Sequence, residues 1–184
     1  SANLVMQLAS QTHPRSVEAC QRLCSTFNRN KLTPFQPEFS SNRLRVALVS
    51  PDLGYHPVGR FVQMLLEAEL GSQGDLYLIS THGTVLKRTK ELIGQNLIEL
   101  NKHSGTTHIQ ILRELNLDVA IDLAGWTGEH SASLFSARIA PVQVNYLGYF
   151  ASSGLPTMDV WLGDEALFPS PMQEWHSESI VRLS

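Results

Sequence analysis

Residues 44–61 read LRVALVSPDLGYHPVGRF. The run from Leu44 to Val49 is apolar apart from Arg45, and a loop rich in Asp, Gly, His and Pro follows it directly. A short buried strand that opens into such a loop is where an open α/β sheet places its ligand chemistry. We therefore interpret this stretch as a strand, a loop and the start of a helix, and we expect the loop to belong to a site.

The strand-like pattern recurs along the chain. Apolar runs lie at about 44–50, 75–80, 118–123, 142–147 and 158–162, with weaker ones at 97–100 and 179–183. Near-continuous Val, Ile and Leu runs are typical of strands buried on both faces of a parallel sheet. Residues 61–70 and 109–115 suit crossover helices. The pattern predicts an α/β fold with a doubly wound, Rossmann-like parallel sheet.

The beginning of the chain has a different character. Residues 1–30 place apolar side chains at helical spacings, with a break at Thr12-His13-Pro14, and residues 31–43 have no periodicity and contain Pro34 and Pro37. The predicted organisation is a helical segment and linker at 1–42, followed by the α/β domain at 43–184.

Composition narrows the class of protein and its partners. The 184 residues are 42% hydrophobic and 17% charged, with a net charge of −3 and a pI near 6.1, as in an ordinary globular protein without a global attraction to nucleic acid or anionic lipid. Cys20 and Cys24 are the two cysteines, which excludes a disulfide framework. We find no membrane-spanning run or signal peptide, so we expect a cytoplasmic protein with no membrane or nucleic-acid partner. The histidines lack zinc-ligand spacing, so no metal is expected.

The first loop contains the sharpest candidate for chemistry, His56. An imidazole can accept a proton from an attacking nucleophile at physiological pH, although many loop histidines are merely solvated. Gly54 permits a close backbone approach, and Pro57 suits the first turn of a helix.

Two further loops follow predicted strands. Asp122 ends one strand and is followed by Leu123-Ala124-Gly125-Trp126-Thr127. Its carboxylate either caps amides of this loop or, with Thr127, faces the same cleft as His56, because the carboxyl ends of parallel strands converge. The stretch from Leu147 to Gly154, which includes Gly148 and Tyr149, follows the next strand and is either a plain loop or a backbone cradle for a phosphate or peptide.

These motifs, in this order and spacing, resemble one family over about residues 40–184: the O-GlcNAc transferase and SPINDLY-like enzymes of glycosyltransferase family 41. The resemblance rests on residues 43–52, His56-Pro57-Val58-Gly59, Asp122-Leu123-Ala124-Gly125, residues 138–144, Leu147-Gly148-Tyr149 and residues 154–159. It departs from the common family pattern at Arg60 and Trp126, where many members carry histidine, and at Phe150-Ala151.

The resemblance implies the N-terminal half of the catalytic region of a GT-B enzyme, usually found behind tetratricopeptide repeats. It implies an inverting transfer of a sugar from a nucleotide-sugar donor, UDP-GlcNAc above all, to Ser or Thr hydroxyls of a protein or peptide acceptor, without a cofactor. By this resemblance His56 and Asp122 are the expected catalytic residues. The expected substrate-binding residues are Asp52, Gly54, Pro57, Gly125, Trp126, Thr127, Gly148 and Tyr149.

Two alternatives stay open at this point. In the family most donor contacts come from the C-terminal half of the catalytic region, and nothing similar to that half is present in this sequence. The chain alone could therefore be a non-catalytic acceptor- or protein-binding module. A nicotinamide-binding enzyme is disfavoured, because no Gly-x-Gly-x-x-Gly follows the first strand.

Overall fold

The computed structural model describes residue 35 and residues 43–68, 74–102 and 105–184. The helical segment and linker predicted at 1–42 lie outside these residues, except for Phe35. The strands are β1 (Leu44–Ser50), β2 (Gly74–Ser80), β3 (Leu97–Glu99), β4 (Val119–Asp122), β5 (Val142–Tyr146), β6 (Val160–Asp164) and β7 (Ser179–Leu183). The α-helices are α3 (Pro57–Glu67), α4 (Lys87–Ile93), α5 (Gly105–Glu114) and α6 (Ala132–Ser136), and short 3-10 turns occupy Gly94–Asn96, Leu100–Lys102 and Ser170–Trp175.

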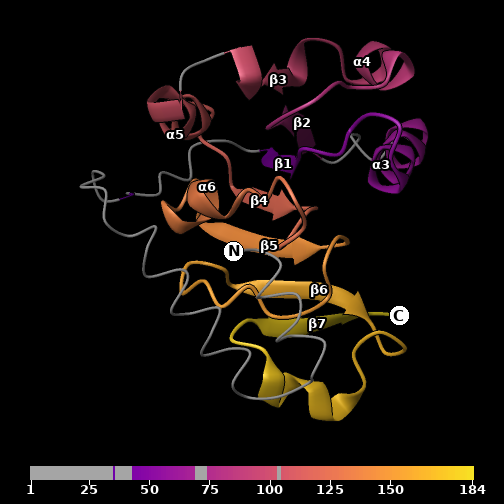
Figure 1. Cartoon of the computed structure of the whole chain (residues 1–184), viewed down its shortest axis with the longest axis vertical. Coiled ribbons are helices and arrows are strands. Elements are labelled where there is room, and N and C mark those ends of the chain that lie inside the picture. The colour runs from indigo at the N-terminus through magenta and orange to yellow at the C-terminus, as the bar shows by residue number, and fades with distance from the viewer. Residues whose placement is uncertain (1–34, 36–42, 69–73, 103–104) are drawn as a thin grey trace.

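All seven strands form one parallel sheet in the order β3-β2-β1-β4-β5-β6-β7 (Figure 1). The predicted doubly wound α/β fold is therefore confirmed, and each predicted strand is present. From β1 the chain proceeds outward to β3 and then returns to β4 on the other side of β1. The switch point of the sheet thus lies between β1 and β4, where the connections on either side diverge, and in open α/β sheets ligands bind in the crevice outside this point.

Local sequence explains where α3 begins. His56 has extended backbone angles (φ −138°, ψ 152°) and caps the helix, and Pro57 occupies its first turn. Proline suits this position because its ring fixes φ near the helical value and no amide hydrogen is lost from the helix. The helix expected at 61–70 therefore starts earlier, at Pro57, and the one expected at 109–115 starts at Gly105. The short helices α4 and α6 have no counterpart among the helices predicted from sequence.

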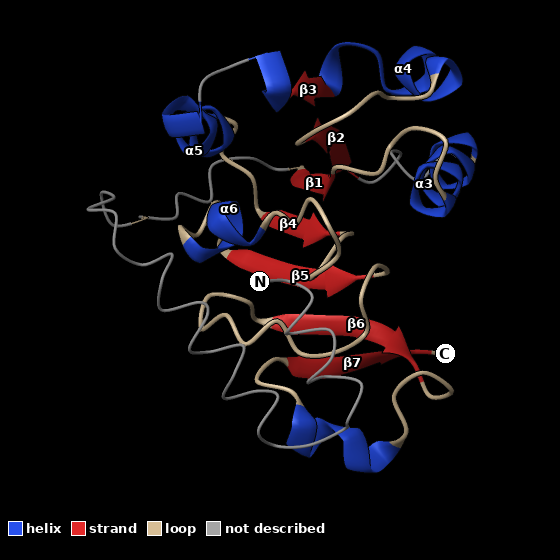
Figure 2. Cartoon of the chain, in the orientation of Figure 1, coloured by secondary structure: helices blue, strands red, loops and turns tan. Residues whose placement is uncertain are grey.

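Helices α5 and α6 lie on one face of the sheet and α3 on the other (Figure 2), and a main hydrophobic core forms on each face, with a smaller cluster of Trp161, Phe168 and Ile180. On one face, Ala47, Val49 and Ala120 pack with Leu112 of α5 and Phe135 of α6. On the other face, Leu48 and Leu78 pack with Val58 and Val62 of α3. Because successive residues of a strand point to opposite faces, β1 contributes to both cores, which explains why Val46 to Val49 are all apolar.

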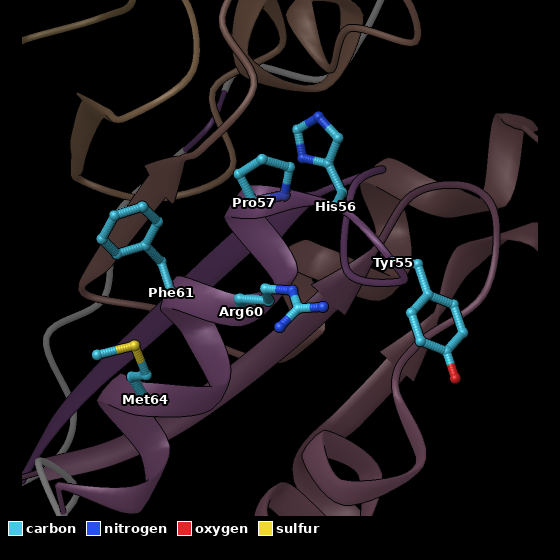
Figure 3. A pocket seen from close by; sticks show the side chains of 6 residues that line it. All are labelled: Tyr55, His56, Pro57, Arg60, Phe61 and Met64. Carbon is cyan, nitrogen blue, oxygen red and sulfur yellow. The ribbon is translucent and has the colours of Figure 1, made fainter.

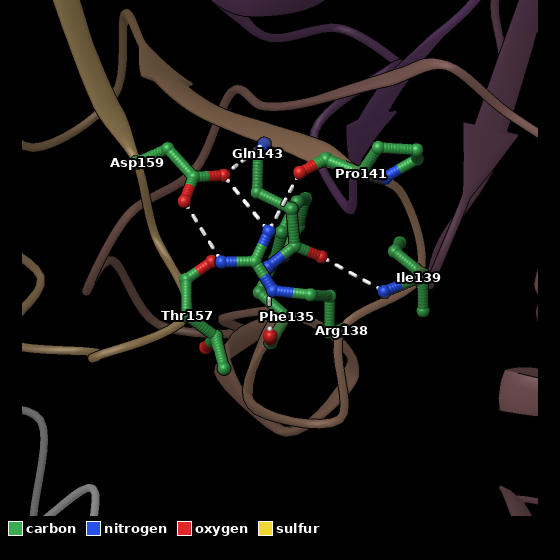
Figure 4. A network of polar contacts seen from close by, with 7 residues as sticks. All are labelled: Phe135, Arg138, Ile139, Pro141, Gln143, Thr157 and Asp159. Carbon is green, nitrogen blue, oxygen red and sulfur yellow. Dashed lines mark hydrogen bonds and ion pairs between the residues drawn. The ribbon is translucent and has the colours of Figure 1, made fainter. Parts of the chain in front are cut away.

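A polar network holds the entry into β5 (Figure 4). The Arg138 guanidinium binds both carboxylate oxygens of Asp159, at 3.0 and 2.8 Å, and donates to Pro141 O at 2.7 Å. The fully buried Gln143 amide donates to Phe135 O and Thr157 O and accepts from Ile139 N. This network lies where β5 begins, at the opposite end of the strand from the crevice.

No helix in the part of the chain that the structure describes has both the length and the apolar character needed to cross a lipid bilayer.

Candidate functional site

Three loops meet at the carboxyl edge of the sheet beside the switch point. They are residues 51–56 after β1, 123–131 after β4 and 147–149 directly after β5, beyond which the chain returns to the start of β5, where Thr157 and Asp159 lie. The first two loops leave neighbouring strands, and Leu123 N donates to Val49 O at 2.9 Å. Each sequence-predicted site residue lies in one of these loops, at the end of β4 or at the start of α3.

His56 is exposed at the N-terminus of α3, and its ring caps the helix. Nδ1 accepts a hydrogen bond from Val58 N at 3.2 Å. A ring nitrogen that accepts is unprotonated, so the proton of the neutral ring belongs on Nε2. In this arrangement Nε2 is a hydrogen-bond donor for any ligand oxygen placed beside it.

A surface pocket of about 280 Å³ adjoins His56 (Figure 3). Its lining comes from the preceding loop and one side of α3 and comprises Tyr55, His56, Pro57, Arg60, Phe61 and Met64. Tyr55 is 96% exposed, and Phe61 and Met64 are more than half exposed. The spacing of apolar residues puts Phe61 and Met64 on one face of this helix and predicts that they are buried, but the structure exposes both. Sequence reasoning did not select them, or Tyr55, as site residues.

The remaining residues of the first loop shape its backbone. Asp52 is half-buried, and its amide donates to Ser50 Oγ at 3.0 Å. Gly54 faces Thr84 so closely that an added Cβ would lie 2.9 Å from the Thr84 carbonyl oxygen. Glycine is therefore required here by the loop that follows β2, and Gly54 has a steric role in this structure.

Asp122 is buried, with 5% of its surface exposed, and its Oδ1 accepts from Ala124 N at 3.0 Å. Burial raises the pKa of Asp122 to about 7, against the opposing effect of the Ala124 and Gly125 amides. The carboxyl group thus caps its own loop, as the first of the two readings expected. It makes no hydrogen bond to His56, whose described partner is Val58, so the two predicted catalytic side chains are not a dyad.

The second and third loops are packed against each other. Gly125, Gly148 and Leu147 all have positive φ, of 58°, 57° and 57°. Tyr149 N donates to Ala124 O at 3.3 Å, and Thr127 Oγ1 donates to the same carbonyl at 2.9 Å. A Cβ on Gly148 would approach Ala124 O to 2.5 Å. The structure therefore brings Gly125, Thr127, Gly148 and Tyr149 together as one unit.

Trp126, one of the expected substrate-binding residues, is buried. Only 3% of it is exposed, and its indole Nε1 donates to Ser153 O at 2.9 Å. The ring contacts His130 edge-on, with centroids 5.0 Å apart, and belongs to the core beneath α6. The Trp126 indole therefore packs in the hydrophobic core, and its hydrogen bond to Ser153 O holds it there.

A buried carboxylate that sequence reasoning missed fixes the chain that follows the third loop. Glu178 is 1% exposed and accepts from Asn145 Nδ2, Ser152 Oγ, Ser153 N and Ser153 Oγ. These partners lie 25–33 residues away in sequence, so no local pattern around Glu178 could have revealed them.

Among residues 43–68, 74–102 and 105–184, no group of three or more His, Cys, Asp or Glu side chains is arranged to hold a metal ion. The site therefore consists of a solvated imidazole, a closely packed pair of glycine-bearing loops and a pocket beside α3.

Comparison with known proteins gives one consistent result. The sequence model of glycosyl transferase family 41 matches residues 12–184. A probable UDP-N-acetylglucosamine–peptide N-acetylglucosaminyltransferase, SEC, from Arabidopsis thaliana is 24% identical over 96% of this chain and 19% of its own length. The SPINDLY protein of Oryza sativa, given the same probable activity, is 27% identical over 80% of this chain and 16% of its own length.

Among solved structures, a variant of the Thermobaculum terrenum O-GlcNAc transferase superposes with a TM-score of 0.82 at 27% identity. The alignment covers 94% of this chain and 34% of that protein. The chain thus spans about a fifth of the length of the curated relatives that it matches along most of its own length.

Proposed function

The chain belongs to glycosyltransferase family 41, and from this premise we propose that it forms the N-terminal half of the catalytic region of an inverting protein O-glycosyltransferase. The donor is a nucleotide sugar, UDP-GlcNAc above all, and the acceptor is a Ser or Thr hydroxyl of a cytoplasmic protein or peptide. A second α/β half of the same longer polypeptide supplies most contacts to the donor. Tetratricopeptide repeats precede the catalytic region in that polypeptide. The names of the relatives support UDP-GlcNAc as the donor and a peptide as the acceptor.

The observation that carries the proposal is the convergence of loops at the switch point. An exposed imidazole at the start of α3 and the joined Gly125 and Tyr149 loops occupy the carboxyl edge of one sheet. Ligands bind at this edge in open α/β sheets, and single displacement depends chiefly on positioning the acceptor and stabilising the departing diphosphate.

In the transfer, the acceptor oxygen forms a bond to the anomeric carbon, the bond to the donor diphosphate breaks, and the hydroxyl proton leaves. The His56 Nε2–H can orient the acceptor oxygen while Nδ1 caps α3. For His56 to take the proton as a base, Nδ1 must release Val58 N, either to accept the proton itself or to carry the ring proton so that Nε2 can accept it; otherwise a donor phosphate oxygen takes it. Asp122 acts on the reaction through the loop whose amides it caps.

The test compares His56→Asn with His56→Ala in the longer protein that carries this sequence. Asparagine keeps the helix cap but removes the imidazole, whereas alanine removes both. We expect both variants to lose at least about a hundredfold in kcat/KM for sugar transfer to a peptide. If His56→Asn transfers sugar at near the unsubstituted rate, the imidazole has no role in the reaction.

A second candidate function is a non-catalytic acceptor- or protein-binding module. The exposed apolar side chains of Tyr55, Phe61 and Met64 beside His56 favour it, because such a patch suits a peptide more than a sugar nucleotide. Binding of peptide without any binding of UDP-GlcNAc by the longer protein would select this alternative.

A further inference from the structure

The pocket beside His56 contains a cation that the fold itself does not use. In the part of the chain that the structure describes, Arg60 is the arginine whose guanidinium makes no hydrogen bond or ion pair. The others bind carboxylates or backbone carbonyl oxygens, as Arg138 binds Asp159 and Arg113 binds Ala137 O. Arg60 is exposed and lines the pocket. Its permanent charge and its planar set of donors are therefore available to an anionic ligand.

The side chains around Arg60 are mainly apolar. Figure 3 shows its guanidinium between Tyr55 on one side and Phe61 and Met64 on the other. A ligand that covers these side chains also removes water from an ion pair with Arg60, and the pair then contributes more than an ordinary exposed pair does. The pocket thus suits a ligand that combines an anionic group with apolar groups, as a peptide with an acidic side chain does.

Helix α3 sets the distance between this cation and the imidazole. His56, Arg60 and Met64 follow one another at intervals of four residues and form a row along the helix, and Arg60 N donates to His56 O at 3.2 Å. Four residues of an α-helix advance about 6 Å. In an extended peptide, side chains two residues apart point to the same side and lie about 6.7 Å apart. A peptide whose hydroxyl lies beside His56 Nε2 can therefore place the side chain two residues away against Arg60.

We propose that Arg60 is a specificity-determining residue, which selects acceptor peptides with Asp or Glu two residues from the Ser or Thr that receives the sugar. This inference rests on the proposed function, because it takes His56 as the place of the acceptor oxygen. The carboxylate pairs with the Arg60 guanidinium, and an apolar side chain further along the peptide contacts Met64. Histidine, common at this position in the family pattern, is mostly neutral at pH 7, so the preference is expected of this chain in particular.

The experiment measures kcat/KM for transfer from UDP-GlcNAc to short peptides by the longer protein that carries this sequence. The peptides differ only in having Asp, Ala or Lys two residues before or two residues after the acceptor. We expect Asp at one of these places to be preferred over Ala about tenfold. Arg60→Ala should reduce this ratio to below about twofold, and Arg60→Glu should favour Lys over Asp. Arg43→Ala, which removes a cation at the opposite end of β1, is the matched control and should retain the tenfold ratio.

A ratio near one in the unsubstituted protein, or a ratio that Arg60→Ala leaves unchanged, would overturn the proposal. A raised KM for UDP-GlcNAc in Arg60→Ala with an unchanged peptide ratio would also overturn it and would assign the guanidinium to the donor diphosphate. Binding of the same peptides, carrying a fluorescent label, is measured by anisotropy on the same protein. Binding that prefers Asp and depends on Arg60, without transfer to any peptide, would refute the proposed function and leave the acid-selective role of Arg60 intact. Transfer without a preference for Asp would refute that role alone, and neither binding nor transfer would refute both.

Discussion

Replacing Gly148 by alanine should separate the two loops that form the base of the crevice. Gly148 has a φ of 57°, and an added Cβ would lie 2.5 Å from Ala124 O, 2.6 Å from Ala124 C and 2.7 Å from Leu123 O. Real Cβ atoms do not approach backbone atoms so closely, and the atoms in the way are main chain, which has no rotamer to change. The Tyr149 loop must therefore move away from the Ala124 loop.

The magnitude follows from two contributions. A left-handed conformation costs an alanine about 1–2 kcal/mol relative to glycine. Forcing a methyl group into a closely packed contact costs typically about 1–3 kcal/mol, including the weakened hydrogen bond from Tyr149 N to Ala124 O. We expect the free energy of unfolding of Gly148→Ala to fall by about 3 kcal/mol. With an m-value of about 2 kcal/mol/M, its urea midpoint falls by about 1.5 M.

Gly83→Ala is the matched control, because Gly83 has a φ of 67° but its added Cβ meets one neighbour, Pro51 O, at an ordinary 3.4 Å. It should lose only the conformational cost, about 1–2 kcal/mol. Urea unfolding is followed by tryptophan fluorescence, and hydrogen exchange at the Tyr149 amide reports the loop contact directly. If the two variants are equally destabilised and the Tyr149 amide exchanges at an unchanged rate, the packing of these loops is refuted.

Three further substitutions, one of them with a control at an exposed ion pair, test buried and half-buried polar groups. As the pH rises from about 4 to 7, Asp122 alone should lower the free energy of unfolding by roughly 1.4 kcal/mol per pH unit. Its pKa rises from 3.8 to about 7 on folding, so in this range the folded state holds a proton that the unfolded state has released. Asp122→Asn should flatten that slope in urea titrations at several pH values, and an unchanged slope would contradict the assignment. Arg138→Lys should lower the free energy of unfolding by about 1–2 kcal/mol, because lysine cannot form the bidentate pair with Asp159. Arg43→Lys, at the exposed pair with Asp75, is the control and should change it by less than about 0.5 kcal/mol when both variants are measured by calorimetry. Glu178→Gln should lower the free energy of unfolding by about 2–4 kcal/mol, since an amide nitrogen would then face the Ser152 and Ser153 donors; a change below about 0.5 kcal/mol would argue against the buried network.

The sequence predicted the fold well because its elements are locally specified. The apolar runs at 44–50 and 142–147 have the length and composition of buried strands, and the structure forms β1 and β5 there. Helix α3 starts at Pro57 because a capping side chain and a proline stand side by side in the chain. The sequence also indicated which loops follow strands, and the parallel arrangement then brings the His56, Gly125 and Tyr149 loops to one edge.

The site was predicted less completely, because the role of a polar or aromatic side chain depends on where distant segments fall. Trp126 was expected at the crevice, yet its indole is buried against Ser153, 27 residues away. Arg138, Gln143 and Asp159 lie within the motifs that carry the family resemblance, and they form a network that holds the start of β5. A short motif can reflect a packing requirement as well as a chemical one.

The sequence by itself determined the strands and the loops that follow them, since these depend on side-chain alternation and turn chemistry within a few residues, whereas α3 and α5 start before the positions that apolar spacing indicated. The tertiary structure decided the strand order with its switch point, the burial that raises the pKa of Asp122 and the hydrogen-bonded environment of the buried Glu178 carboxylate. Solvent exclusion and hydrogen-bond partners come from segments 25 or more residues apart, and only the folded arrangement brings those segments together.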